Sequence, residues 1–89
     1  MKYSYVTFPD DTEVTFSDFY EDGSVKVYIE TPVYGGFHNA TCLLPEYNWI
    51  SVDGYSAEEM KKWDDFMHDN AHLILELAAG GGFENATAV

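Results

Sequence analysis

The chain has 89 residues and a formal net charge of −12, with 16 acidic residues against four basic ones. All four basic residues are lysine, because the sequence contains no arginine. Proteins that bind nucleic acids or anionic membranes neutralise phosphates with Arg and Lys, so this composition argues against direct contact with either. The length suits one domain, and the acidic charge implies solubility, a metal ion or a basic partner.

Cysteine usage and the first residues of the sequence indicate the cellular compartment of the protein. The single cysteine, Cys42, excludes an internal disulfide and is expected to be a small strand residue in a reducing compartment. No apolar signal segment opens the sequence, and no run approaches the length of a membrane span. We therefore expect a cytoplasmic location. Two N-x-T matches, at Asn39 and Asn85, are interpreted as chance.

Four stretches of alternating apolar and polar residues predict β-strands, at residues 2–8, 13–17, 24–31 and 37–44. The third is the clearest, because Val25, Val27 and Ile29 share one face. Pro32 and Pro45 are expected to end the third and fourth strands. The following stretch is either irregular or a short edge strand, at residues 46–52.

Short turn signals separate these stretches. Residues 9–12, Pro-Asp-Asp-Thr, favour a turn because proline presets one dihedral angle and aspartate bonds its own backbone. Asp22-Gly23 and Asp53-Gly54 are two further turn signals. Connections this short join antiparallel neighbours, so the strands are expected to form a meander.

Residues 56–80 predict a single long amphipathic helix. Ser56 and Glu59 have the spacing of a capping box, and Tyr55 and Met60 that of a hydrophobic staple. Gly80 is expected to end the helix in the left-handed conformation that glycine adopts readily.

The helix has two distinct faces at about 100° per residue. Its apolar face is formed by Met60, Trp63, Phe66, Met67, Ile74, Leu77 and Ala78. Its polar face is formed by Lys61, Lys62, Asp64, Asp65, His68, Asp69, His72 and Glu76. We expect Trp63, Phe66 and Ile74 to cover the sheet face that carries Val25, Val27 and Ile29. Asn70 lies within the apolar arc and is expected to bond a loop backbone group.

These elements predict an α+β fold, an antiparallel four-stranded or five-stranded β-meander packed against one long C-terminal α-helix. We expect a single domain over residues 1–89, with the sheet in 1–54, the helix in 55–80 and a tail in 81–89. Residues 35–41 recur as 81–87 with one mismatch. Either this is chance reuse of a turn-into-strand sequence, or the tail forms a short strand.

No motif for catalysis or for a cofactor stands out. His68, His72 and Glu76 are each one helical turn apart and could approach one metal ion, but a polar helix face with two histidines is usually solvated. Cys42 lacks a histidine within reach, because His38 lies four strand residues away. We therefore expect a non-enzymatic protein without a metal or cofactor.

Acidic residues form the most informative pattern. Four helix residues fall within a narrow arc, roughly 6 to 10 Å apart along the axis: Glu58, Asp65, Asp69 and Glu76. This spacing is comparable with that of phosphates along an extended nucleic-acid strand. The loops between the early strands add Asp10, Asp11, Glu21 and Asp22, with Glu13 and Asp18 beside them. We interpret the four helix residues, together with Asp10, Asp11, Glu21 and Asp22, as the partner-binding surface. The alternative is that these side chains are merely solvated.

Residues 70–78, followed by 81–86, resemble the C-terminal end of small uncharacterised bacterial and phage-borne proteins. In size and acidity alone, the chain is similar to anti-CRISPR and other phage anti-defence inhibitors. That resemblance implies an inhibitor that occupies the nucleic-acid site of a defence protein. One alternative is a self-associating adaptor of a mobile element, a homodimer formed through exposed aromatic residues. Another is a weak metal-binding protein that uses His68, His72 and Glu76.

Overall fold

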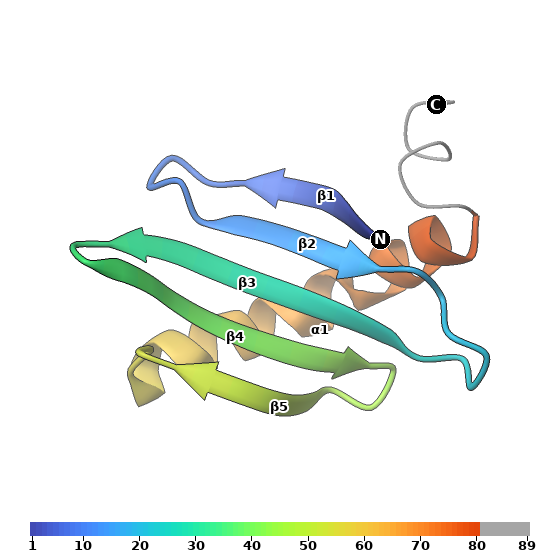
Figure 1. Ribbon diagram of the computed structural model, residues 1–89. Helices are drawn as coiled ribbons and strands as arrows, with labels where there is room; N and C mark the ends of the chain where they lie inside the picture. The colour runs from blue at the N-terminus through green and yellow to red at the C-terminus, as the bar shows by residue number, and fades with distance from the viewer. Residues whose placement is uncertain (81–89) are drawn as a thin grey trace.

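The computed structural model of the protein describes residues 1–80. Its elements are β1 (Lys2–Thr7), β2 (Glu13–Ser17), β3 (Val25–Val33), β4 (Gly36–Leu44), β5 (Asn48–Asp53) and α1 (Ala57–Ala79). The strands form one antiparallel sheet in the order β1-β2-β3-β4-β5, and α1 crosses one of its faces (Figure 1). The predicted α+β meander is confirmed, with residues 48–53 as the fifth strand. The strand considered for residues 81–89 lies outside the described residues.

The hairpin formed by β3 and β4 is longer than predicted. Pro32 does not end β3, because it pairs with Phe37 inside the hairpin. The pairing of β2 with β3 stops at Glu30, so the hairpin extends beyond its neighbour and Pro32 occupies an edge position, where proline is tolerated. Figure 1 shows this projection of the β3–β4 turn past the ends of the other strands.

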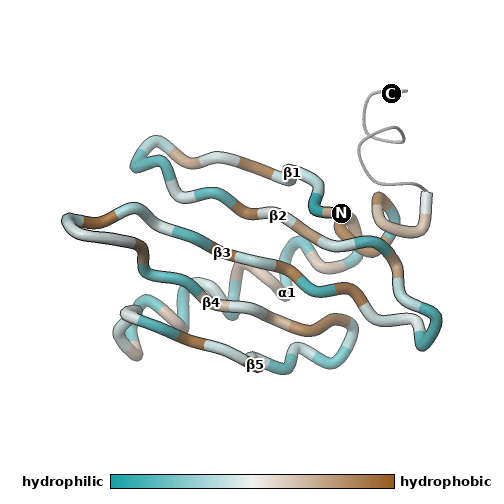
Figure 2. The backbone as a smooth tube through the Cα atoms, viewed as in Figure 1, coloured by the Kyte–Doolittle hydropathy of each residue, from teal (hydrophilic) through white to brown (hydrophobic). Residues whose placement is uncertain are grey.

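The core lies between the sheet and α1. Hydrophobic residues alternate with hydrophilic ones along β2, β3 and β4 (Figure 2), as a sheet with one covered face requires. The buried apolar residues of the sheet are Val14, Phe16, Val25, Val27, Ile29, Ala40, Cys42 and Leu44. Those of α1 are Met67, Ala71, Ile74 and Ala78. The predicted cover of Val25, Val27 and Ile29 by the helix is confirmed.

The aromatic residues of α1 lie nearer the margin of the core than predicted. Trp63 and Phe66 are only half-buried. They pack edge-on against one another and against Phe8, while Trp63 also meets Tyr55. The large rings therefore pack against the edge of the core, and Met67 and Ala71 are among the helix residues that are buried within it.

The start of α1 is the capping box that the sequence predicts. The Ser56 Oγ accepts a hydrogen bond from the Glu59 N–H at 3.1 Å, and the Glu59 Oε1 accepts one from the Ser56 N–H at 2.9 Å. The helix also ends at Gly80, but the expected left-handed cap is wrong, because Gly80 has a φ of −89°. Its N–H still donates to the Glu76 carbonyl at 3.0 Å, so the last turn simply continues for one more bond.

Asn70 joins α1 to the first strand. Its expected partner, a loop backbone group, is wrong. The Tyr5 hydroxyl donates to the Asn70 Oδ1 at 2.6 Å, and the Asn70 Nδ2 donates to the Phe66 carbonyl of its own helix at 2.8 Å. A register shift between Ser4 and Val6 leaves Tyr5 out of the ladder with β2, which frees its side chain for this contact.

Candidate acidic interaction surface

The acidic face of α1 consists of Glu58, Asp65, Asp69 and Glu76. All four are exposed. At about 100° per residue they lie on the side of the helix opposite the buried Met67, Ala71, Ile74 and Ala78. Within residues 1–80 none of the four takes part in a salt bridge or a side-chain hydrogen bond. Their charges are therefore available to a partner.

The basic residues of α1 sit at one end of this face. Lys61 and Lys62 are exposed in the first turns, close to Glu58. Beyond them the helix carries no further lysine as far as Gly80. The stretch from Asp65 to Glu76 is thus the part of the face with an uncompensated negative charge.

The four acidic loop residues do not form one cluster. Asp10 and Asp11 belong to the turn between β1 and β2, whereas Glu21 and Asp22 belong to the turn between β2 and β3. The strand β2 separates these turns, so they lie at opposite ends of the sheet (Figure 1). Asp10 lies near the start of α1, because it lines the same small hollow as Glu59.

Two of these loop carboxylates hold their own turns. The Asp10 Oδ1 accepts a hydrogen bond from the Thr12 N–H at 3.0 Å. The Asp22 Oδ1 accepts bonds from the Ser24 N–H at 3.0 Å and from the Ser24 hydroxyl at 2.6 Å. These bonds lower the pKa of both carboxyls below its ordinary value. Asp10 and Asp22 therefore have a local structural role, as the turn signals indicated.

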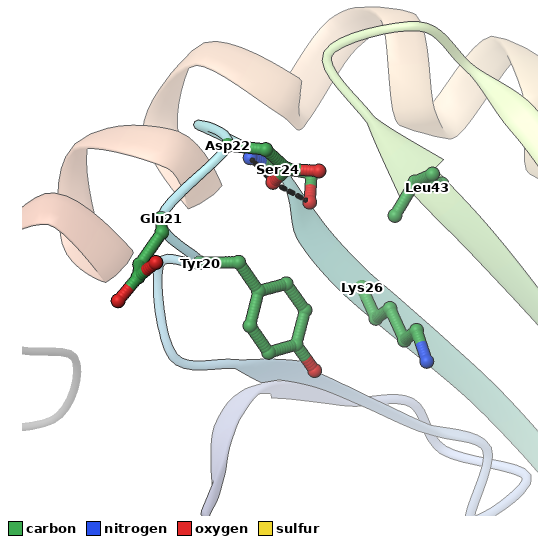
Figure 3. Close-up of a pocket in the computed structure, with 6 residues that line it drawn as sticks. All are labelled: Tyr20, Glu21, Asp22, Ser24, Lys26 and Leu43. Carbon is green, nitrogen blue, oxygen red and sulfur yellow. Dashed lines mark hydrogen bonds between the residues drawn. The ribbon is translucent and has the colours of Figure 1, made fainter.

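A shallow hollow of about 490 Å³ lies beside the turn between β2 and β3. Figure 3 shows its six lining residues: Tyr20, Glu21, Asp22, Ser24, Lys26 and Leu43. Glu21 points away from Lys26, and Asp22 is directed to Ser24 (Figure 3). Charges of both signs meet at this end of the sheet, so Glu21 and Asp22 do not extend a uniformly acidic surface.

Sequence reasoning missed a cluster that ties β5 to α1. Asp64 was assigned to the polar face, but it is half-buried and accepts a hydrogen bond from the Trp49 Nε1 at 3.0 Å. The His68 Nδ1 donates to the Asp64 carbonyl at 2.9 Å, and its ring stacks on Tyr47 with centroids 3.9 Å apart. The sequence shows that Asp64 and His68 are one helical turn apart, but it does not reveal their partners, Trp49 on β5 and Tyr47 in the turn before it.

The residues considered for a metal site are arranged along one side of α1. His68 already uses one ring nitrogen for the Asp64 carbonyl, while His72 and Glu76 are exposed. Within residues 1–80 no three His, Cys, Asp or Glu side chains are placed to hold one metal ion. Of the two ring nitrogens of His68, only Nε2 would be left for a metal ion while this bond is kept.

Removal of metal is expected to leave stability unchanged. Thermal melting curves recorded with and without a chelator should overlay, because a metal that binds only the folded state adds directly to its stability. A fall of several degrees in Tm after chelation would contradict this expectation. The double substitution of His68 and His72 by Gln would then show whether these residues hold the ion.

Cys42 is buried in the core. Burial, together with the nearby Asp64 carboxylate, raises the pKa of its thiol to about 12. Because the thiolate is the nucleophilic form, a thiol that stays protonated at neutral pH is unreactive. Its role is that of a small strand residue, as expected.

Comparison with protein families, with curated proteins and with solved structures gives no match for this chain. Within residues 1–80, α1 is the single helix, and it is not apolar enough to cross a membrane. The case for a function is therefore built on the surface itself.

Proposed function

We propose that the protein is a small non-enzymatic inhibitor that binds the basic surface of a nucleic-acid-handling protein of a defence system, such as a CRISPR effector. The observation that supports this proposal is the unpaired row of Asp65, Asp69 and Glu76 on the outer face of α1. Residues four and seven apart on a helix lie about 6 and about 10 Å apart along its axis. A straight row of carboxylates at this spacing offers lysine and arginine side chains the charges that phosphates otherwise supply.

The charge of the whole chain favours association with such a surface. A formal charge of −12 on 89 residues creates a negative potential that attracts a basic partner and speeds encounter. The same potential repels nucleic acid. Because both would bind the basic surface of the partner, the protein and the nucleic acid would compete for it. A target of this kind places the inhibitor in the cytoplasm, and the interaction requires no cofactor.

Exposed apolar residues provide a second contact for a protein partner. Tyr34 is fully exposed at the turn of the β3–β4 hairpin, and Phe37 is 60% exposed beside it. Exposed aromatic residues often supply much of the binding energy in protein interfaces. Tyr28 and Tyr47 are less available, since both are half-buried and Tyr47 stacks on His68.

Neutralising the row on α1 is expected to weaken binding. The variant Asp65→Asn, Asp69→Asn, Glu76→Gln keeps the size of three exposed side chains, so the fold should be retained. Used as bait beside the wild type, it should lose a nucleic-acid-binding protein that the wild type retains. With that protein purified, the on-rate should fall most at low salt, because the attraction is electrostatic. A nucleic-acid ligand of the partner should displace the wild type.

A matched variant controls for charge alone. Glu13→Gln, Glu46→Gln, Asp53→Asn removes three exposed carboxylates from β2, the β4–β5 turn and β5, away from α1 in the sequence, and should bind nearly as the wild type does. If the α1 variant binds like the wild type at low salt, the proposal is wrong. It is also wrong if nucleic acid and this protein occupy the partner together.

A further inference from the structure

The sheet has a second face, opposite α1, that no described element covers (Figure 1). Strand register places its residues in three rows across the sheet. The first row is Lys2, Ser17, Lys26, Leu43 and Asn48. The middle row is Ser4, Thr15, Tyr28, Thr41 and Ser51. The third row is Thr7, Glu13, Glu30, Asn39 and Asp53.

The charges on this open face are separated by sign. The first row holds two of the four lysines in the chain, the middle row is neutral, and the third row holds Glu13, Glu30 and Asp53. Lys26 and Glu30 are four residues apart on β3, which is about 13 Å along the strand. The open face therefore has a basic end and an acidic end.

Neither end is neutralised by a salt bridge within residues 1–80, although Glu21 and Asp22 line the same hollow as Lys26 at the basic end. Glu13 and Glu30 lie directly opposite one another on β2 and β3, an arrangement that is unfavourable for like charges. Neither they nor the two lysines take part in a salt bridge in this part of the chain. The Lys2 Nζ instead lies 4.0 Å above the centre of the Tyr28 ring. Each end would be stabilised by a surface of opposite sign.

We propose that the open face binds the open face of a second copy of this chain, with the two-fold axis along the middle row. That rotation reverses the strand direction, so the basic row of one copy lies over the acidic row of the other. It brings Lys26 opposite the partner's Glu30, sets Lys2 beside the partner's Glu13, and places Tyr28 near its symmetry mate. An axis parallel to the strands would place lysine on lysine, and charge therefore selects the first arrangement.

The resulting dimer has four layers, helix–sheet–sheet–helix. Stacked sheets lie about 10 Å apart, close enough for Lys26 and the partner's Glu30 to meet. The middle row is polar apart from Tyr28, so a weak, concentration-dependent dimer is expected. Both acidic faces of α1 remain on the outside. The dimer goes beyond the proposed inhibition and does not rest on it, although it would give an inhibitor two binding faces.

Charge-swapped variants test the arrangement directly. In sedimentation experiments up to millimolar concentration, the wild type should shift from monomer to dimer. Lys2→Glu, Lys26→Glu gives two acidic ends and should stay monomeric. Glu13→Lys, Glu30→Lys gives two basic ends and should also stay monomeric. An equimolar mixture of the two variants should dimerise again, because every contact then joins opposite charges.

Lys61→Glu, Lys62→Glu is the matched control. It lowers the net charge by the same amount as Lys2→Glu, Lys26→Glu but alters α1, so it should dimerise like the wild type. When it is mixed with Glu13→Lys, Glu30→Lys, it should not form the heterodimer that the swapped pair forms. Rescue by this mixture would show that net charge, and not the rows, drives association.

A measurement on the wild type keeps the test independent of how the variants fold. On dilution, NMR amide shifts should change at Thr15, Tyr28 and Thr41 and stay constant along the outer face of α1. The proposal is overturned by a wild type that stays monomeric throughout, by a swapped mixture that stays monomeric, or by shifts confined to other surfaces. A dimer that is lost only with Tyr34→Ser would place the interface at the hairpin turn, and would equally overturn it.

Discussion

Replacing Ile74 with alanine is expected to lower the free energy of unfolding by about 2–5 kcal/mol. The Ile74 side chain is completely buried between α1 and the sheet. Its truncation removes apolar contacts and leaves a cavity that the neighbouring strands fill only in part. Small domains are stable by about 5–15 kcal/mol, so this loss should be visible as a large fall in the denaturant midpoint.

The neighbouring residue is the matched control. Leu73 is 44% exposed on the same helix, so Leu73→Ala should change stability by about 0.5 kcal/mol or less. Chemical denaturation of both variants, followed by tryptophan fluorescence, gives the comparison. Similar losses for the two variants would contradict the placement of the helix on the sheet.

The substitution Gly54→Ala is expected to destabilise the protein by about 2–4 kcal/mol. Gly54 connects β5 to α1 with a φ of 94°, a conformation that is unfavourable for a residue with a Cβ atom. A Cβ atom at this position would also collide with the His38 ring. The ring lies edge-on to Tyr55, with centroids 5.7 Å apart, so its displacement would disturb the start of the helix.

Two comparisons separate the backbone effect from the collision. Gly23 has a φ of 86° but nothing within 4 Å of a Cβ atom, so Gly23→Ala should cost only about 1 kcal/mol. In a His38→Ala background, Gly54→Ala should cost about the same smaller amount. If Gly54→Ala and Gly23→Ala have equal effects on Tm, the collision with His38 is not a constraint on the fold.

Local signals explain which parts of the fold were predictable. Ser56 and Glu59 are three residues apart, so the capping box and the start of α1 could be inferred without any tertiary contact. Alternation along β3 likewise revealed its buried face. The prediction that Pro32 ends β3 is wrong because that rule assumes a strand with a neighbour on each side. Beyond Glu30, β3 is no longer paired with β2.

Long-range contacts explain what the sequence could not predict. The helical periodicity places Asp64 on the polar face of α1, but the Trp49 side chain on β5 donates a hydrogen bond to it. Asn70 finds its partner on β1 only because a bulge releases Tyr5. The acidic arc of α1 followed from local periodicity, whereas the open sheet face depended on the register of five strands. Asp11 and Glu21 were grouped by closeness in sequence, although the single strand between their turns already implied opposite ends of the sheet.

The element that covers the sheet is the last of the described elements to leave the ribosome. Pairing between strands adjacent in sequence allows the meander to form early, since only short loops must close. Translation at about 5–20 residues per second takes on the order of 1–5 s to add the 23 residues of α1. Until α1 docks, Phe16, Ile29 and Leu44 lack the cover that Ile74 supplies, and transiently exposed apolar surface of this kind is what chaperones protect from aggregation.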